Sequence, residues 1–217
     1  MKTVLFIHRS VGENLIIDGH IYRLLEKYPN IKFSDYNVNN NNLRTAIKTQ
    51  KLLLVWPNDN TRPKDYSLLF SQKTEFTETL DFIMNYDIII IKSCYPNSNI
   101  KNDNELNNIK SYYLSIVEYF KNQQSKKLII FSSPPLRPTR TNKANSLRAR
   151  NLSNWMTKEN FADNISVFNL FDLLADQKTN LLKKQYQRLF PFNMHPNKKA
   201  GNSIAPDFIN LVNEIAD

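Results

Sequence analysis

Continuous apolar runs separated by amphipathic segments constrain the fold of this chain more than any other feature. The runs at 88–91 (Ile-Ile-Ile-Ile) and 128–131 (Leu-Ile-Ile-Phe) contain no polar residue. Such runs are typical of strands that are buried on both faces of a parallel sheet. Together with shorter runs of the same kind they predict five strands, at 3–7, 31–36, 87–92, 127–132 and 165–168. We therefore expect a doubly wound α/β fold, with helices on both faces of a parallel sheet.

The segments between these runs have helical periodicity. In 104–121 the apolar residues recur at steps of three and four, which gives one apolar face; they are Leu106, Ile109, Tyr113, Ile116, Val117 and Phe120. A first helix is expected at 12–27. The last segment is also amphipathic, and Pro206 inside it is expected to start a new turn or to kink the helix. The segment 52–65 fits a short strand or an apolar loop over the sheet edge, and its length makes it a candidate cover for an active site.

Length and composition narrow the possibilities further. A chain of 217 residues fits one domain, residues 1–217. With Cys94 as the single cysteine, no disulfide can form within the chain. Only three glycines occur, so neither a dinucleotide-binding nor a Walker-type glycine loop can be written. No apolar run approaches the roughly 20 residues of a membrane span, and the apolar stretch at the N-terminus is too short for a signal peptide. We predict a soluble cytoplasmic protein without a membrane partner.

The charge is strongly positive, at +9. A nucleic-acid partner would require that charge to gather on one face or one helix. The lysines are instead spread along the chain, in clusters no larger than pairs such as 126–127 and 198–199. The pattern therefore favours a scattered basic surface over a nucleic-acid partner, and it leaves the oligomeric state open.

Two residues near opposite ends of the chain form a candidate catalytic pair. Ser10 follows the first strand, 3–7, and in a parallel sheet ligands and nucleophiles gather at that strand end. A weakly nucleophilic hydroxyl needs a base within hydrogen-bond reach, and His195 lies just before the last helix. The alternative is that Ser10 is the N-cap of the first helix, with Glu13 completing a capping box, and that His195 is a polar surface residue.

Several groups are candidates for binding a developing negative charge. Gly12 would allow a tight turn, and amides at the start of the first helix could point at an oxyanion. The loop after the isoleucine run offers Ser93 and Asn97, and the asparagine-rich turn after 31–36 offers Asn37. Cys94 is expected to be a small packed residue rather than a nucleophile.

These pieces, in this order, resemble the SGNH (GDSL-like) hydrolase superfamily from residue 3 to about residue 212. The resemblance rests on 7–14 (Ile-His-Arg-Ser-Val-Gly-Glu-Asn), 91–98 (Ile-Lys-Ser-Cys-Tyr-Pro-Asn-Ser) and 192–197 (Phe-Asn-Met-His-Pro-Asn). It implies a flavodoxin-like three-layer α/β/α domain and ester hydrolysis through an acyl-serine. It implies no metal or organic cofactor. The implied substrate is a small ester, such as an O-acetyl group on a carbohydrate.

The sequence also departs from the family pattern. The first block reads His8-Arg9-Ser10 rather than Gly-Asp-Ser, and the Gly-x-Asn-Asp form of the third block is absent. Asn193 stands where the resemblance places the aspartate that orients the histidine. An amide can hold an imidazole by hydrogen bonding, but it cannot stabilise an imidazolium by charge; in serine proteases that replacement costs about ten-thousand-fold in kcat.

Three interpretations of this departure remain open. A nearby carboxylate could substitute, with Asp172 and Asp207 as candidates, or Ser10 and His195 could act as a weak dyad. Alternatively the protein is a non-catalytic binder of a carbohydrate or acidic ligand. Convergence of a set of arginines beside the cleft would favour an anionic ligand; these are Arg62, Arg137, Arg140, Arg148 and Arg150.

Overall fold

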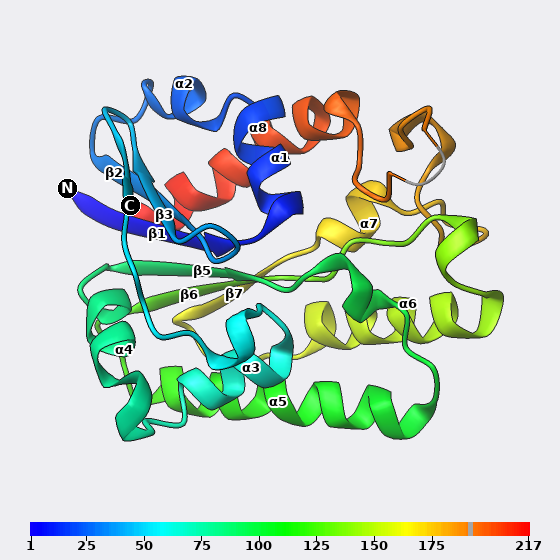
Figure 1. The fold of residues 1–217 in the computed structure, drawn as a ribbon, viewed down its shortest axis with the longest axis horizontal. Helices are drawn as coiled ribbons and strands as arrows, with labels where there is room; N and C mark the ends of the chain where they lie inside the picture. Colours follow the sequence, from blue (N-terminus) through cyan, green and yellow to red (C-terminus); the bar gives the residue numbers. More distant parts are fainter. Residues whose placement is uncertain (191–192) are drawn as a thin grey trace.

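The computed structural model describes residues 1–190 and 193–217. Pro191 and Phe192, the latter the first residue of the histidine-containing segment, lie outside the described residues. One sheet runs through the middle of the described chain in the order β4-β3-β2-β1-β5-β6-β7 (Figure 1). Its strands are β1 (Lys2–His8), β2 (Ile31–Asn37), β3 (Asn42–Thr45), β4 (Thr49–Lys51), β5 (Ile88–Lys92), β6 (Lys127–Phe131) and β7 (Ile165–Phe168).

The five predicted strands are confirmed, and they run parallel to one another in the order β2-β1-β5-β6-β7. The hairpin of β3 and β4 was not predicted; it adds two antiparallel strands at the β2 edge. All three residues of β4, Thr49–Lys51, are exposed, and the two strands of the hairpin have only polar side chains apart from Leu43. An edge strand of this kind has no apolar run by which a sequence pattern could reveal it.

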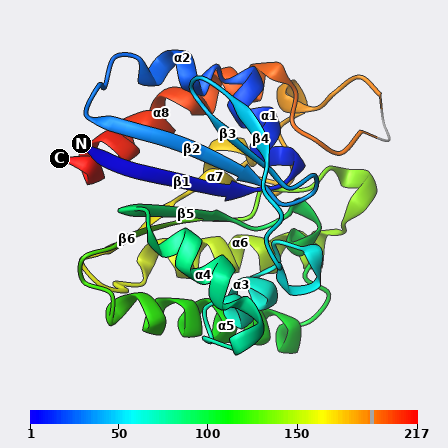
Figure 2. The same ribbon diagram turned by 60° about the vertical axis from the view of Figure 1, so that its left-hand side comes forward.

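Helices cover both faces of the sheet and give three layers (Figures 1 and 2). One face carries α1 (Ser10–Asp18), α2 (Ile21–Leu25), α7 (Leu170–Leu174) and α8 (Lys198–Ala216). The other carries α3 (Pro63–Leu69), α4 (Thr77–Met84), α5 (Asp103–Lys121) and α6 (Lys143–Lys158). Short 3-10 turns lie at Pro57–Asp59, Thr74–Phe76, Tyr95–Ser98, Pro138–Arg140 and Lys184–Tyr186. No helix in the described part of the chain is long and apolar enough to span a bilayer.

The buried strands divide their side chains between two cores. Along β5, Ile88 and Ile90 pack in the core beneath α1 and α8, whereas Ile89 and Ile91 pack in the core on the α5 side. This alternation follows from the two-residue period of a strand. The final helix is anchored by Phe208, whose ring lies 5.2–6.3 Å from those of four strand phenylalanines, Phe6, Phe33, Phe131 and Phe168. This packing fixes the helix that follows His195.

The structure differs from the sequence-based expectations in two helices and decides between two alternatives for one loop. The helix expected at 12–27 is two helices, because His20 between them has a left-handed backbone with φ of 52°. The last helix continues without interruption through Pro206, which is exposed and lies within Lys198–Ala216. The segment 52–65 forms no strand; it is a loop that includes a 3-10 turn and leads into α3.

Candidate active site

Ser10 is the first residue of α1, directly after the central strand β1. Arg9 is the N-cap and has extended backbone, and it makes no capping hydrogen bond with its side chain. The capping-box alternative is therefore wrong: Ser10 is not the cap, and the carboxylate of Glu13 binds Asn37 and Arg44 instead of turning back to the helix start. The Ser10 hydroxyl is half-buried and has no capping role, so it is available for other chemistry.

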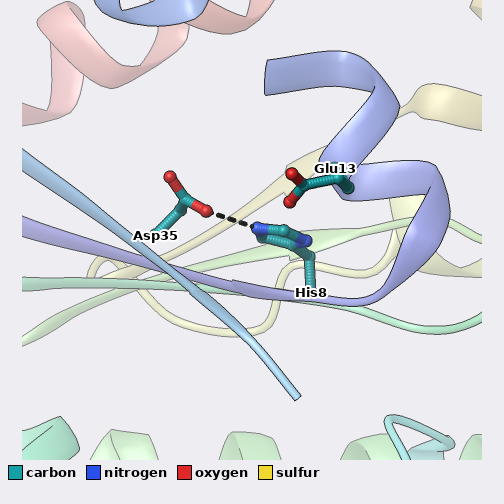
Figure 3. Close-up of side chains that lie close together, drawn as sticks. All are labelled: His8, Glu13 and Asp35. Atoms are coloured by element: carbon teal, nitrogen blue, oxygen red, sulfur yellow. Dashed lines mark hydrogen bonds and ion pairs between the residues drawn. The ribbon is translucent and has the colours of Figure 1, made fainter. Parts of the chain in front are cut away.

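A buried histidine–aspartate pair lies beneath this helix start (Figure 3). His8 Nε2 is 2.8 Å from Asp35 Oδ2, and His8 Nδ1 is 3.0 Å from the Arg9 carbonyl oxygen. Both ring nitrogens of His8 therefore have an oxygen within hydrogen-bond distance. Tyr22 donates to the second carboxylate oxygen of Asp35 at 2.6 Å. Burial and the neighbouring carboxylate raise the pKa of Tyr22 and keep it a neutral donor.

Glu13 and Arg44 complete the network around this pair. Arg44 forms an ion pair with Glu13 and lies 3.7 Å from Asp35. His8, Glu13 and Asp35 could each offer a metal-ligand atom within 4.8 Å of the others. Each of these atoms already has a protein partner, and the Arg44 cation occupies the same cluster. We therefore describe the cluster as a network of His8, Arg44 and two carboxylates, which ties β1, β2 and β3 to α1 below Ser10.

Asp35→Asn is expected to destabilise the protein strongly. It removes the carboxylate that the His8 ring, 0% exposed, contacts, and breaking a buried pair from one side costs about 3–5 kcal/mol. Urea unfolding measures the change in the free energy of unfolding. Asp207→Asn, at an exposed carboxylate on α8, is the control and should change it by less than about 0.5 kcal/mol. A similarly small change for Asp35→Asn would show that the pair does not hold the helix start.

Gly12 serves a different purpose from the tight turn that was predicted. It lies inside α1 and has no positive φ. A Cβ atom at this position would overlap the His8 side chain. The glycine is therefore needed for the close approach of α1 to β1 at the point where Ser10 is placed.

Gly12→Ala should consequently lower the stability of the protein. Forcing a methyl group against a buried ring costs about 1–3 kcal/mol and shifts the first turn of α1. Thermal unfolding measures this effect. Ile17→Ala is the matched control, since Ile17 is 54% exposed on the same helix. An unchanged melting temperature for Gly12→Ala would contradict the packing argument.

His195 is held by Asn193. The Oδ1 atom of Asn193 lies 3.1 Å from the backbone nitrogen of His195 and 3.2 Å from its Nδ1. The backbone N–H can only donate, so it fixes this atom as the amide oxygen, and Nδ1 must then carry a proton to donate to it. His195 Nε2 is left unprotonated in the neutral ring. That atom is buried and has no hydrogen-bond partner among the described residues.

The surroundings keep the His195 ring neutral. Burial lowers its pKa, and the nearby cations of Arg188 and Lys92 lower it further. Neither predicted acidic substitute is seen to hold it. Asp172 forms an ion pair with Arg150 and accepts from Asn169, while Asp207 is exposed. Asn193 is thus the residue that orients the ring, and His195 has the properties of a base rather than an acid at neutral pH.

The chain neighbours of Ser10 and His195 lie on one slot. Val11, which follows Ser10, and Pro196, which follows His195, both line a narrow slot between α1, α7 and α8. In the structure Nε2 makes no hydrogen bond with the Ser10 hydroxyl, because Nε2 has no partner among the described residues. Catalytic hydrogen bonds are often long in ligand-free proteins and tighten when substrate binds. The pairing of the two residues stays a prediction.

The three side chains predicted to bind an oxyanion all have partners within the protein. Asn37 donates to Glu13 at 3.1 Å, and Asn97 donates to the Cys94 carbonyl at 2.9 Å. Ser93 Oγ lies 2.5 Å from Ser133 Oγ and accepts from a buried tyrosine, Tyr113. The backbone N–H of Ser10, by contrast, belongs to the first residue of a helix and has no acceptor within that helix. A catalytic role for the three side chains and for the Ser10 N–H stays a prediction.

Comparison with known proteins supports the fold. No protein-family model and no curated protein sequence matches the chain. Among solved structures, a proposed acylhydrolase of Bacteroides fragilis aligns over 100% of this chain and 88% of its own, with a TM-score of 0.62 and 12% identity. A GDSL-like lipase of Bacteroides thetaiotaomicron aligns over 98% and 88%, with a TM-score of 0.54 and 13% identity. A protein of Streptococcus pneumonia, titled as a proposed platelet activating factor, aligns over 96% and 83%, with a TM-score of 0.56 and 14% identity.

The chain has the fold of the SGNH (GDSL-like) hydrolases. The resemblance predicted from the sequence and the three-layer α/β/α architecture are confirmed. Within this SGNH-like fold, Ser10 follows the first strand and His195 precedes the last helix.

The arginines that a non-catalytic anion-binding protein would need do not form a free patch. Three of them have carboxylate partners: Arg62 pairs with Asp65, Arg148 with Asp103, and Arg150 with Asp172. The other two contact the loop before His195. Arg137 donates to the carbonyls of Phe190 and Asn193, and Arg140 donates to the Met194 sulfur. These contacts favour a structural role for most of the set over ligand binding.

One residue of the site escaped prediction. Lys92 ends β5 and is only 2% exposed, although lysine is almost never fully buried without a partner. The signal was present, because a lysine closes a run of four isoleucines in a strand that is buried on both faces. Burial lowers the pKa of Lys92 to about 8.

Proposed function

We propose that this protein is a serine ester hydrolase that works through an acyl-serine intermediate. Ser10 is the nucleophile, His195 the base, and Asn193 the residue that orients the base. The observation that carries the proposal is the state of His195: Asn193 fixes its Nδ1 tautomer, and Nε2 is buried without a partner. A neutral imidazole with a free, desolvated Nε2 is the group that activates a hydroxyl nucleophile.

The reaction follows from these positions. Ser10 Oγ attacks the acyl carbonyl carbon while Nε2 of His195 takes the hydroxyl proton. The carbonyl oxygen becomes negative, and the N–H of Ser10 at the start of α1 donates to it. The tetrahedral intermediate then collapses, the C–O bond to the alcohol breaks, and the imidazolium returns the proton to the leaving oxygen. Water repeats the sequence on the acyl-serine, and this releases the acid.

The substrate is proposed at the level of chemical class. Two structures with this fold are named as an acylhydrolase and a lipase, and both names denote reactions of acyl esters. The slot beside Ser10 is narrow and lined mainly by aliphatic side chains, among them Leu170, Leu174 and Ile204. A small acyl ester, such as an O-acetyl group on a carbohydrate, is proposed by analogy of fold alone.

Labelling with a fluorophosphonate probe tests the proposal. The probe phosphonylates serines that an adjacent base has activated. We expect the wild-type protein to be labelled and both Ser10→Ala and His195→Ala to lose the label. Ser203→Ala, at an exposed serine on α8, is the control and should be labelled like the wild type. Absence of labelling in the folded wild-type protein, or labelling that persists in Ser10→Ala, would contradict the proposal.

A further inference from the structure

Lys92 lies where the chemistry of the proposed reaction takes place. It is the last residue of β5, the strand next to β1. Ile7 of β1 pairs with Ile91, so the following residues, His8 and Lys92, are neighbours across the two strand ends. Like Ile88 and Ile90, Lys92 is directed to the α1 and α8 face of the sheet. Ser10 begins the helix that covers this face.

The Lys92 ammonium is buried without a counter-charge. Its one hydrogen bond goes to the Ser93 carbonyl at 3.0 Å, and no carboxylate pairs with it among the described residues. An ammonium has three N–H donors, so two are left without a protein acceptor. A buried cation of this kind is costly for the fold, and natural proteins keep such groups mainly at functional sites.

The slot between α1 and α8 brings Lys92 close to the chain neighbours of the proposed catalytic pair. Lys92 lines this slot together with Val11 and Pro196, which follow Ser10 and His195. Lys92 is also close enough to His195 to lower the pKa of that imidazole by charge repulsion. We take this slot as the space that an acyl group would enter, with the ammonium on its wall.

We propose that Lys92 is a catalytic residue of this site, whose ammonium donates a hydrogen bond to the acyl oxygen as that oxygen becomes negative. The inference rests on the proposed ester hydrolysis. It adds a charged side-chain donor to the neutral groups of Asn37, Ser93 and Asn97, each of which already has a hydrogen-bond partner within the protein. No proton leaves Lys92 during the reaction. It acts by charge and hydrogen bonding, while proton transfer stays with His195.

This role requires the protonated lysine and so limits activity at high pH. The titratable and charged groups around the lysine are His8 on β1, Cys94 after β5, Asp18 on α1, and Arg188 and His195 from the segment before α8. Asp18 forms its ion pair with Arg188 at 3.5 Å. Because burial lowers the pKa of Lys92 to about 8, the hydrolysis rate should fall as the pH rises through about 8.

The test compares Lys92→Met and Lys92→Arg with the wild type in the hydrolysis of p-nitrophenyl acetate from pH 6 to 10. Loss of one oxyanion donor costs about 10²–10³ in kcat, so Lys92→Met should lose at least about 100-fold. It should also lose the decline near pH 8. Lys92→Arg should recover part of the rate and keep it to higher pH, since arginine stays protonated. Lys183→Met is the matched control, because Lys183 also donates to a backbone carbonyl, that of Leu173. This variant should hydrolyse the ester at the wild-type rate.

Stability separates catalysis from a structural role. Replacing an unpaired buried cation with a residue of similar shape is expected to leave the melting temperature unchanged or to raise it at pH 7. In the wild type the unfolded chain binds the lysine proton more tightly than the folded protein, so stability should rise between pH 8 and 10.5, and Lys92→Met should lack this rise. A Lys92→Met variant that melts lower and keeps its kcat would overturn the inference.

The same experiment distinguishes the two proposals. Unchanged hydrolysis in Ser10→Ala would remove the proposed function and the role of Lys92 with it. Loss of activity in Ser10→Ala together with full activity in Lys92→Met would remove only the inference about Lys92.

Discussion

Ser10→Ala and His195→Ala are each expected to reduce the kcat of ester hydrolysis to about 10⁻⁴ of the wild-type value or less. A nucleophile and its base act as one unit, so removing either loses nearly the whole contribution of the pair, about 10⁶-fold in the best-studied serine hydrolase. The measurement is steady-state hydrolysis of p-nitrophenyl acetate. The wild type must first be shown to exceed the background rate of the ester.

The double variant is the sharper part of this prediction. Ser10→Ala combined with His195→Ala should be no slower than either single variant, because the second substitution removes a group that no longer has a partner. His20→Ala is the matched control, since His20 is an exposed histidine on the same side of the sheet. Losses that add in the double variant would mean that the two residues act separately and that no Ser10–His195 pair exists.

Asn193→Asp is expected to increase activity, by about tenfold to a hundredfold in kcat. Asn193 already orients the ring correctly through Oδ1, so a carboxylate would keep the tautomer and add a charge that stabilises the imidazolium in the transition state. Lys92 and Arg188, whose charges now lower the pKa of His195, would favour the added carboxylate. An opposite charge at hydrogen-bond distance raises a pKa by about 1–3 units, so the acidic limb of the pH–rate profile should move upward.

Asn193→Leu is the companion variant. It removes the acceptor for Nδ1, and the imidazole should then populate both tautomers and orientations, with a loss of kcat. If Asn193→Asp and Asn193→Leu both hydrolysed ester at the wild-type rate, the contact between Asn193 and His195 would have no part in catalysis.

The parallel sheet was predictable because its signal is local and repeated. Runs such as Ile88–Ile91 can be buried on both faces only in a covered sheet, and each of the five predicted strands is present. The β3–β4 hairpin was not predictable by the same rule, because its exposed edge strand carries polar side chains. The division of the first helix at His20 depends on backbone geometry and on the packing of α1 against α8, which no periodicity records.

The site was predictable in part for a similar reason. Ser10 and His195 stand at positions that topology alone makes suggestive, a strand exit and a helix entrance. The ion-pair network of His8, Asp35 and Arg44 joins residues up to 36 positions apart and depends on strand register, so the sequence alone does not reveal it. Lys92 was not predicted as a site residue. The observation that indicates a role for it is its burial at the end of β5.

Trapping the acyl-enzyme is the most direct test of the proposed acyl-serine mechanism. The protein is mixed with p-nitrophenyl acetate, quenched in acid within milliseconds to seconds, and analysed by intact-mass and peptide mass spectrometry. We expect one acetyl group per chain, located on Ser10. It should appear and decay in step with ester hydrolysis, and it should be absent in His195→Ala. Acetylation of a different residue, such as Cys94 or Lys92, or hydrolysis without any acetyl group on Ser10, would contradict the central claim.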